Sequence, residues 1–312
     1  MKLISIVFSF RNEQENLEEL INRTVNTLKD LSDWQYELIF VNDASTDNSE
    51  DILLKFQKIY PIKLINLSRR FGHGPAVMAG FENTKGDCIV YLDSDLQDPP
   101  ELLVTLVNEY EKGFDVVHTK RIKRMGESRI KLLITSLAYF IINILSDIPL
   151  KQNVGEFKLI SRRVLDQMLK LKEQETFLRG LSVWIGFKQT YIDYIRQPRF
   201  KGDTHFPLLG STQPAKDFIR GITSFSLAPL YFACIIGILT IFLSFFLIIY
   251  FLYLKFNNLS VSGFASVYIL ICFFSGMILF TIGIASLYLA RIWHEIKSRP
   301  RYIISEIKDY NK

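Results

Sequence analysis

Short apolar runs alternate with amphipathic stretches over the first 120 residues. The runs predict buried strands at 3–10, 37–41, 62–66, 88–92 and 115–118. Helical spacing or helix-start residues predict intervening helices at 13–31, 48–60 and 74–84 and after Pro100. Asn12, with Glu15 three residues later, resembles a capping box at the start of the first helix. Strands separated by helices are typical of an α/β fold with a parallel, doubly wound sheet, whose ligands bind at the carboxyl ends of the strands.

Two much longer apolar runs occupy the C-terminal third. No Asp, Glu, Lys, Arg or His occurs between Arg220 and Lys255, or between Lys255 and Arg291. Each run exceeds the roughly 20 residues that a helix needs to cross a bilayer. The pattern therefore predicts transmembrane helices at 228–254 and 264–290. A buried hairpin in a soluble core is the alternative, which the lack of charge on every helix face disfavours.

Basic residues around the two spans predict their orientation. They are Lys216 and Arg220 before the first span, Lys255 between the spans, and Arg291, Lys297, Arg299 and Arg301 after the second. The positive-inside rule places both termini and the N-terminal domain in the cytoplasm of a protein integral to the cell membrane. The first residues, MKLISIVFSFRNEQEN, do not resemble a signal peptide because their apolar run is short and leads into acidic residues.

These patterns predict five parts of the chain. They are a cytoplasmic α/β domain over 1–215, an interfacial juxtamembrane helix over 216–227, the two spans, and a basic cytoplasmic tail over 291–312. Within the domain, residues 129–150 are apolar, begin with cations and end near Pro149. We expect this segment to form a helix on the membrane surface, with a core helix as the alternative.

Composition narrows the class of protein. The mean hydropathy of +0.17 is high for a chain with 22% charged residues, as two membrane spans would explain. The net charge of +5 is modest, and the basic residues cluster at the membrane face, so nucleic acid is not an expected partner. The three cysteines lack metal-ligand spacing, which indicates a reduced compartment and no zinc site.

The stretch YLDSDLQDPPE carries the strongest chemical signal, because a buried strand ends in Asp93 and Asp95. Residues two apart in an extended chain point to the same side, so both carboxylates could bind one ion. Hard oxygen ligands suit Mg²⁺ or Mn²⁺ together with substrate phosphates. Gln97 and Asp98 could add a direct or water-mediated ligand. The alternative is a solvated acidic turn that caps the next helix.

Two other polar loops follow predicted strands. In VNDASTDNS, Asp43 could accept hydrogen bonds from a base or a ribose. In NLSRRFGHG, Arg69 and Arg70 stand beside two glycines, which suits contact with phosphates or a base. A plain basic turn is the alternative for the second loop.

Five segments occur in the order found in family 2 glycosyltransferases with the GT-A fold: SIVFSFRNEQENL, VNDASTDNS, RRFGHGPAVMAGF, YLDSDLQDPPE and KRIKRMGES. The chain most resembles the polyprenyl-phosphate glycosyltransferases, a branch that includes dolichyl-phosphate mannose synthase and bactoprenol glucosyltransferase. The later segments VGEFKLISRRVLD, ETFLRGLSVWIGF and YIRQPRFKGDTHF are similar to that branch too. The resemblance extends over nearly the whole chain up to residue 290.

The resemblance implies a role for each matching residue. It implies a nucleotide-sugar pocket at Ser9, Arg11, Glu13, Asp43, Arg70 and Asp93, and a metal site at Asp93, Asp95 and Gln97. It implies acceptor-phosphate contacts from Arg121, Arg124, Arg129 and Arg199. Glu156 stands where the family usually has Asp, near the reacting centre, and Asp95, Glu156 and Arg121 are the catalytic candidates. Lys158 replaces a usual Arg, and Asn42 and Ala44 depart mildly from a commoner D-D-G-S pattern.

The implied reaction is inverting, metal-dependent transfer of a sugar from a nucleotide-sugar to undecaprenyl or dolichyl phosphate at the cytoplasmic membrane face. The product would be a sugar donor for glycan or envelope modification. UDP-glucose is the first choice of donor, and GDP-mannose, a UDP-N-acetylhexosamine and a modified aminosugar nucleotide are alternatives. Family members of this shape are often homo-oligomers, which the spans could mediate.

Three rival classes are less well supported. A processive polysaccharide synthase would carry T-E-D and Q-x-x-R-W motifs, which the sequence lacks. A dehydrogenase would need G-x-G-x-x-G after the first strand, where the sequence has SFRNEQ. A catalytically silent membrane scaffold is the alternative from another class, and the intact D-S-D and arginines argue against it.

Overall fold

The computed structural model describes residues 1–123, 143–144, 151–171, 173–174, 177–198, 200, 223, 226–257 and 263–310. The chain forms two compact units. The first comprises Met1–Asn143, Ile148–Gly221 and Arg299–Lys312, and the second comprises Ile144–Asp147 and Ile222–Ser298. The C-terminal residues therefore belong to the same unit as the N-terminal domain.

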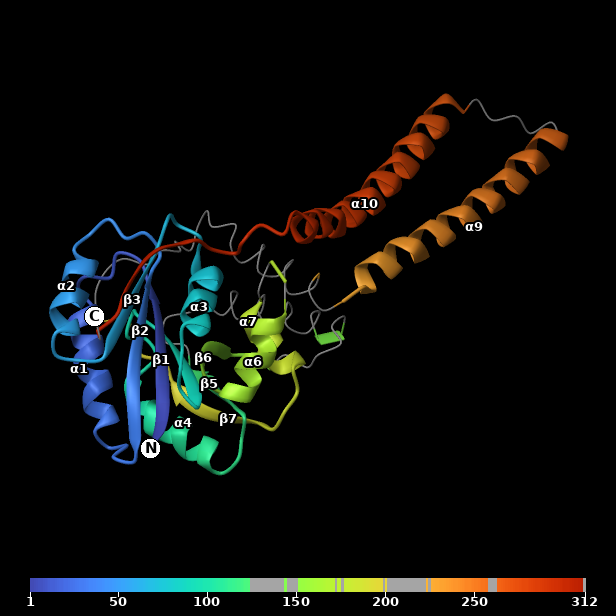
Figure 1. The fold of residues 1–312 in the computed structure, drawn as a ribbon. Coiled ribbons are helices and arrows are strands. Elements are labelled where there is room, and N and C mark those ends of the chain that lie inside the picture. Colours follow the sequence, from blue (N-terminus) through green and yellow to red (C-terminus); the bar gives the residue numbers. More distant parts are fainter. Residues whose placement is uncertain are drawn as a thin grey trace. The chain divides into compact units, whose positions relative to one another are not determined.

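A mixed sheet forms the centre of the first unit, with the strand order β7-β5-β6-β4-β1-β2-β3-β8 in the part of the chain that is described (Figure 1). The strands are β1 (Lys2–Phe10), β2 (Trp34–Asn42), β3 (Ile62–Leu67), β4 (Cys88–Asp93), β5 (Val116–Lys123), β6 (Val154–Ser161), β7 (Gln189–Ile195) and β8 (Ile304–Lys308). Strand β1 pairs in parallel with β2 and β4, and β2 with β3. Strand β6 is antiparallel to β4 and β5, and β8 is antiparallel to β3. The predicted parallel arrangement is confirmed for the first four strands, whereas β6, β7 and β8 were not predicted.

Helices cover both faces of this sheet (Figure 1). One face carries α1 (Leu17–Leu28), α2 (Ser49–Gln57), the 3-10 turn η1 (Pro100–Leu102) and α4 (Leu103–Glu111), and the other carries α3 (His73–Glu82), α6 (Arg162–Lys170) and α7 (Leu178–Trp184). Side chains of β1 alternate between the two faces. Ile6 and Phe8 join the core cluster with Leu17 of α1, whereas Val7 lies against Gly80 of α3. The two layers of helix are therefore packed on opposite sides of one strand.

The residues after the second long helix add β8 to the edge of the sheet. Ser305 Oγ donates to the Asn66 carbonyl at 2.9 Å, and Lys308 Nζ lies 2.8 Å from Glu50 Oε1. The backbone carbonyl of Lys308 accepts a 2.9 Å hydrogen bond from the Gln57 side chain. The sequence pattern predicted only a basic tail here, so this strand is new information.

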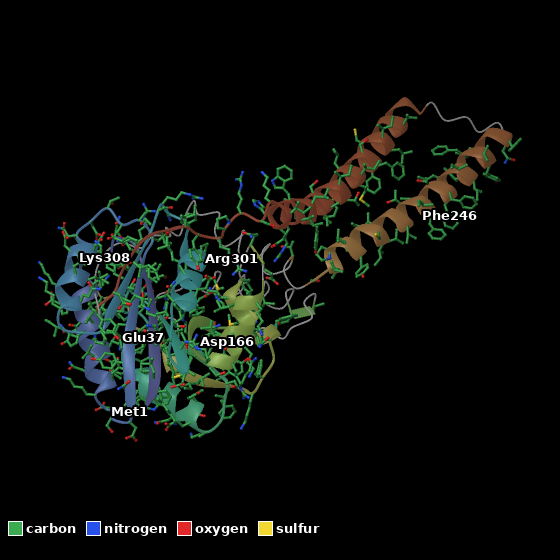
Figure 2. All side chains as sticks on the ribbon, in the orientation of Figure 1. Met1, Glu37, Asp166, Phe246, Arg301 and Lys308 are labelled. Atoms are coloured by element: carbon green, nitrogen blue, oxygen red, sulfur yellow. The ribbon has the colours of Figure 1, made fainter. Side chains whose placement is uncertain are left out.

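The second unit contains two long helices that contact each other, α9 (Ala228–Phe256) and α10 (Phe264–Lys297). The segments Ala228–Leu254 and Leu270–Lys297 are long and apolar enough to cross a membrane, with mean hydropathies of 2.9 and 2.3. Their apolar side chains point outward, as Phe246 does (Figure 2). The two predicted apolar helices are present, although α10 continues beyond residue 290. The helices expected at 129–150 and 216–227 lie almost wholly outside the described residues.

Candidate active site

The carboxyl ends of the parallel strands meet at one edge of the sheet. Ser9 of β1 is in register with Asp93 of β4 on one side and with Val41 of β2 on the other. Strand β6 runs the opposite way and pairs Lys158 with Tyr91. Continuing this antiparallel register two residues forward along β4 and two residues back along β6 would bring Glu156 level with Asp93. The sheet thus brings together Ser9, Asp93 and Glu156, which the sequence predicted as site residues.

The loop after β4 presents the three predicted metal ligands on one side. Asp93, Asp95 and Gln97 are partly exposed, and the residues between them are buried. Asp93 Oδ1 accepts a 2.6 Å hydrogen bond from the Tyr91 hydroxyl. Asp95 Oδ1 accepts a 3.1 Å hydrogen bond from the backbone N–H of Gln97. Among the described residues, no group of three His, Cys, Asp or Glu side chains could hold a metal ion. Two carboxylates and an amide oxygen fit Mg²⁺ or Mn²⁺, because these ions take further ligands from water and substrate phosphates.

Asp98 does not fit the additional ligand role that the sequence suggested. Its side chain is fully buried and accepts a hydrogen bond from the hydroxyl of Tyr194. Arg121 Nη2 lies 3.5 Å and Arg196 Nε 3.6 Å from the same carboxylate. The prediction failed because the turn after β4 directs this carboxylate inward, onto Tyr194 and the two arginines, whereas Asp93, Asp95 and Gln97 stay partly exposed.

Asp43 holds the loop that follows β3. Its carboxylate accepts hydrogen bonds from the backbone amides of Phe71 at 2.7 Å and Gly72 at 3.0 Å. Gly72 has φ +96°, which a residue with a side chain rarely adopts. Arg70 is exposed at the rim of this loop. The Asp43 carboxylate has further lone pairs that could still accept hydrogen bonds from a base. That contact stays a prediction.

The remaining predicted nucleotide contacts differ in how they are held. Ser9 Oγ lies 2.9 Å from the Tyr91 hydroxyl. Arg11 has a buried Nη1 atom with no hydrogen-bond partner in the protein. The Glu13 carboxylate is buried and accepts a 2.6 Å hydrogen bond from Asn16 at the start of α1. Of the three, Arg11 is the side chain with an unused donor for a ligand.

A histidine that the sequence did not assign joins Asp93 to Glu156. His73, the first residue of α3, has Nδ1 4.0 Å from Asp93 Oδ1 and Nε2 3.8 Å from Glu156 Oε2. Burial would lower the pKa of His73, but the charges of Glu156 and Asp93 outweigh it and raise that pKa to about 9. The two carboxylates therefore favour the protonated form of His73. Its only sequence signal was its place in the glycine-containing loop after a strand.

Glu156 is an ionised carboxylate between two cations. Its Oε1 accepts a 3.0 Å hydrogen bond from Arg179 Nε. Burial would raise the pKa of Glu156, but His73 and Arg179 hold it well below its usual range. Lys158, two residues further along β6, lines the same cavity as Glu156 and donates to Ser182 Oγ at 2.8 Å. Burial lowers the pKa of this lysine to about 8.

The predicted acceptor-phosphate arginines are only partly placed. Arg121 is 14% exposed and is occupied by Asp98 and by the Tyr194 hydroxyl, to which its Nε donates at 2.9 Å. Arg124, Arg129 and Arg199 lie outside the described residues. Their role stays a prediction.

Comparison with known proteins assigns the family. Residues 5–169 match the sequence model of Glycosyl transferase family 2. The uncharacterized glycosyltransferase YkcC of Bacillus subtilis is 39% identical over 97% of this chain and 93% of its own length. The chain belongs to glycosyl transferase family 2. A second relative of this transferase, the bactoprenol glucosyl transferase of Shigella phage SfX, is 33% identical over 98% of this chain and 99% of its own.

A solved structure supports the fold of the transferase. Mannosyl-3-phosphoglycerate synthase from Rubrobacter xylanophilus has a TM-score of 0.50 and 17% identity, over 72% of this chain and 73% of that chain. At this identity the likeness concerns the fold alone. The GT-A-like α/β fold and the glycosyltransferase activity that the resemblance implied are both confirmed.

Proposed function

We propose that this glycosyltransferase transfers a sugar from a nucleotide-sugar, with UDP-glucose as the first choice, to the phosphate of a membrane polyprenol. The observation that carries the proposal is the extent of the similarity to the bactoprenol glucosyl transferase of Shigella phage SfX. That similarity covers 98% of this chain, and therefore α9 and α10 as well as the α/β unit. Bactoprenol is a polyprenol, and a lipid acceptor gives a reason for joining a catalytic unit to two helices of membrane-crossing length.

The donor would bind at the carboxyl edge of β1 and β4. Asp93, Asp95 and Gln97 would hold Mg²⁺ or Mn²⁺, which would neutralise charge developing on the leaving diphosphate. Tyr91 orients Asp93 through its 2.6 Å hydrogen bond. The N-terminus of α3, which begins with His73, favours an anion at the same edge.

The acceptor chemistry needs cations more than a base. An oxygen of the lipid phosphate attacks the anomeric carbon, the bond from that carbon to the diphosphate oxygen breaks, and the nucleoside diphosphate leaves with inversion. A phosphate monoester is already anionic near pH 7, because its second pKa is about 6. Arginines that hold the phosphate therefore matter most. The predicted orientation places this reaction at the cytoplasmic face.

The test is transfer of radiolabelled sugar from a panel of UDP- and GDP-sugars to undecaprenyl phosphate by the purified full-length protein. We expect label in the lipid from one donor, dependence on Mg²⁺ or Mn²⁺, and an inverted anomeric configuration in the product. Asp95→Asn should lower kcat about a hundredfold or more, because it removes a charge that stabilises the transition state. Asp51→Asn, the same change on the exposed side of α2, is the matched control and should leave the rate unchanged.

Other outcomes would contradict the proposal in distinct ways. Nucleotide binding without transfer from any donor would indicate a different acceptor or an unusual activated sugar. Absence of both binding and transfer would favour a silent membrane scaffold. Transfer that persists in EDTA would remove the metal from the reaction.

A further inference from the structure

Asp98 lies three residues after Asp95, yet it is buried among side chains of other strands. Tyr194 of β7 donates its hydroxyl to this carboxylate, and Arg121 of β5 lies 3.5 Å from it. Arg196, just after β7, lies 3.6 Å away. Arg121 and Tyr194 are also joined to each other by a 2.9 Å hydrogen bond. One carboxylate at the end of the predicted metal loop is therefore held from two neighbouring strands.

The loop needs such an external restraint. Leu96, between Asp95 and Gln97, is buried and has φ +58°, a left-handed conformation that is unfavourable for a residue with a side chain. A second contact restrains the loop from the same side, because the Gln97 carbonyl accepts a 3.0 Å hydrogen bond from the Gln197 amide. Both attachments lead to β7 and the residues that follow it.

Gly155 of β6 leaves space for the side chain of Arg121. A Cβ atom on Gly155 of β6 would lie 2.9 Å from Arg121 Nη2 and 3.2 Å from its Cζ. The Arg121 amide is fixed as well, because it donates to the Asn153 carbonyl at 2.9 Å. Glycine at position 155 thus leaves the space through which Arg121 reaches Asp98.

We propose that Asp98, Arg121 and Tyr194 form a positioning cluster that keeps Asp95 and Gln97 turned toward the donor diphosphate. This inference rests on the proposed metal-dependent transfer. It gives Arg121 a positioning role in place of the direct contact with acceptor phosphate that the resemblance implied. The cluster also links the donor side to the acceptor side, because β7 continues in sequence to Arg199, a predicted acceptor-phosphate residue.

The test measures binding of Mn²⁺ to the full-length protein in detergent by electron paramagnetic resonance, with UDP at saturation. Asp98→Asn keeps the size of the side chain and removes the charge that holds Arg121 and Tyr194. Loss of a partner behind a metal ligand typically weakens metal affinity about ten- to a hundredfold, and we expect that loss here. Tyr194→Phe, which removes one hydroxyl, should act in the same direction with a smaller effect. Hydrogen exchange in a peptide covering 93–98 should become faster in both variants.

Matched controls come from the same strand. Asp193→Asn and Tyr191→Phe make the same chemical changes on β7 outside the cluster, and both should keep the Mn²⁺ affinity and exchange rate of the unchanged protein. If Asp98→Asn fails to fold, as judged by circular dichroism, Tyr194→Phe decides the question.

The outcomes separate this inference from the proposed function. Unchanged Mn²⁺ affinity, or unchanged exchange over 93–98, in folded variants would overturn the positioning cluster even if the protein transfers sugar normally. If the unchanged protein binds no Mn²⁺ with UDP, the metal in the proposed function fails instead. The exchange comparison then still decides whether Asp98 holds the loop.

Discussion

Gly80 lies where α3 crosses β1 and has no room for a side chain. A Cβ atom there would lie 2.3 Å from Val7 Cγ1 and 3.2 Å from Val41 Cγ2.

The conformation of Asn12 also depends on tertiary contacts. The predicted capping box is wrong, because α1 begins at Leu17, and Asn12 instead adopts φ +54° and accepts a 2.8 Å hydrogen bond from the Thr46 amide. The role of each residue depends on a segment far away in the sequence.

Gly80→Ala should destabilise the α/β unit. Overpacking of a close helix–strand contact costs about 1–3 kcal/mol, which should exceed the gain of about 1 kcal/mol in helix propensity. Urea denaturation followed by circular dichroism would measure the loss. Val7→Ala should cost less in the Gly80→Ala background than alone, because it makes space for the new methyl group. Strictly additive effects of the two substitutions would contradict the close approach.

Strands β5, β6 and β7 enclose a neutral histidine. His118 of β5 is fully buried, with Nε2 2.9 Å from Gln189 Oε1 and its ring stacked on Tyr191. Burial, reinforced by the charge of Lys158, lowers the pKa of His118 to about 3. In an unfolded chain this pKa is about 6.5. The elements around His118 therefore favour its neutral form.

This depressed pKa predicts a loss of stability in acid. The contribution of His118 is complete above pH 6.5 and is lost as the pH falls from 6.5 toward 3, because only the unfolded state gains the proton. Each pH unit in that window costs about 1.4 kcal/mol, or about 2 kcal/mol at pH 5. His118→Gln should remove this part of the pH dependence of the unfolding free energy, measured in urea at pH 7 and pH 5. A difference between the two proteins that is the same at both pH values would show that His118 does not titrate on unfolding.

The chain returns to its N-terminal unit after the long helices. Residues 301–308 contact several elements, including α2 through Lys308 and Glu50, and the Ser68 amide donates to the Ile303 carbonyl at 2.9 Å (Figure 2). Strand β8 covers the edge of β3, which would otherwise present unpaired backbone groups. The whole molecule thus uses its last residues to complete the sheet on which its first residues lie.

Deleting residues 304–312 should destabilise the α/β unit and promote aggregation. We expect the melting temperature in detergent to fall by roughly 4 °C or more, corresponding to about 2 kcal/mol for a unit of this size. A synthetic peptide of residues 299–312 should restore part of the loss by pairing with β3. Lys308→Ala alone should cost less than about 1 kcal/mol, since it removes only a partly exposed ion pair. An unchanged melting temperature after deletion would mean that β8 adds no stability.

The sequence by itself determined the features that depend on neighbouring residues or on ordered motifs. The spacing of apolar residues was sufficient to predict the first five strands and the two long apolar helices. The order of the polar segments was sufficient to predict the family. Alternation along an extended chain predicted that Asp93 and Asp95 face one side. Both are partly exposed, although the backbone turns directly after Asp93.

Only the tertiary structure decided which side chains from different strands and helices come into contact. The antiparallel strand β6 brings Glu156 level with Asp93, and His73 arrives from the start of α3 to lie between them. In the sequence Asp98 resembles the nearby carboxylates Asp93 and Asp95. In the structure it is buried against Arg121 and Tyr194, which lie 23 and 96 positions away along the chain. Such contacts follow from the order and direction of strands, which no short-range pattern encodes. The physical reason is that burial next to distant cations, and not residue type, separates a positioning carboxylate from one that faces a ligand.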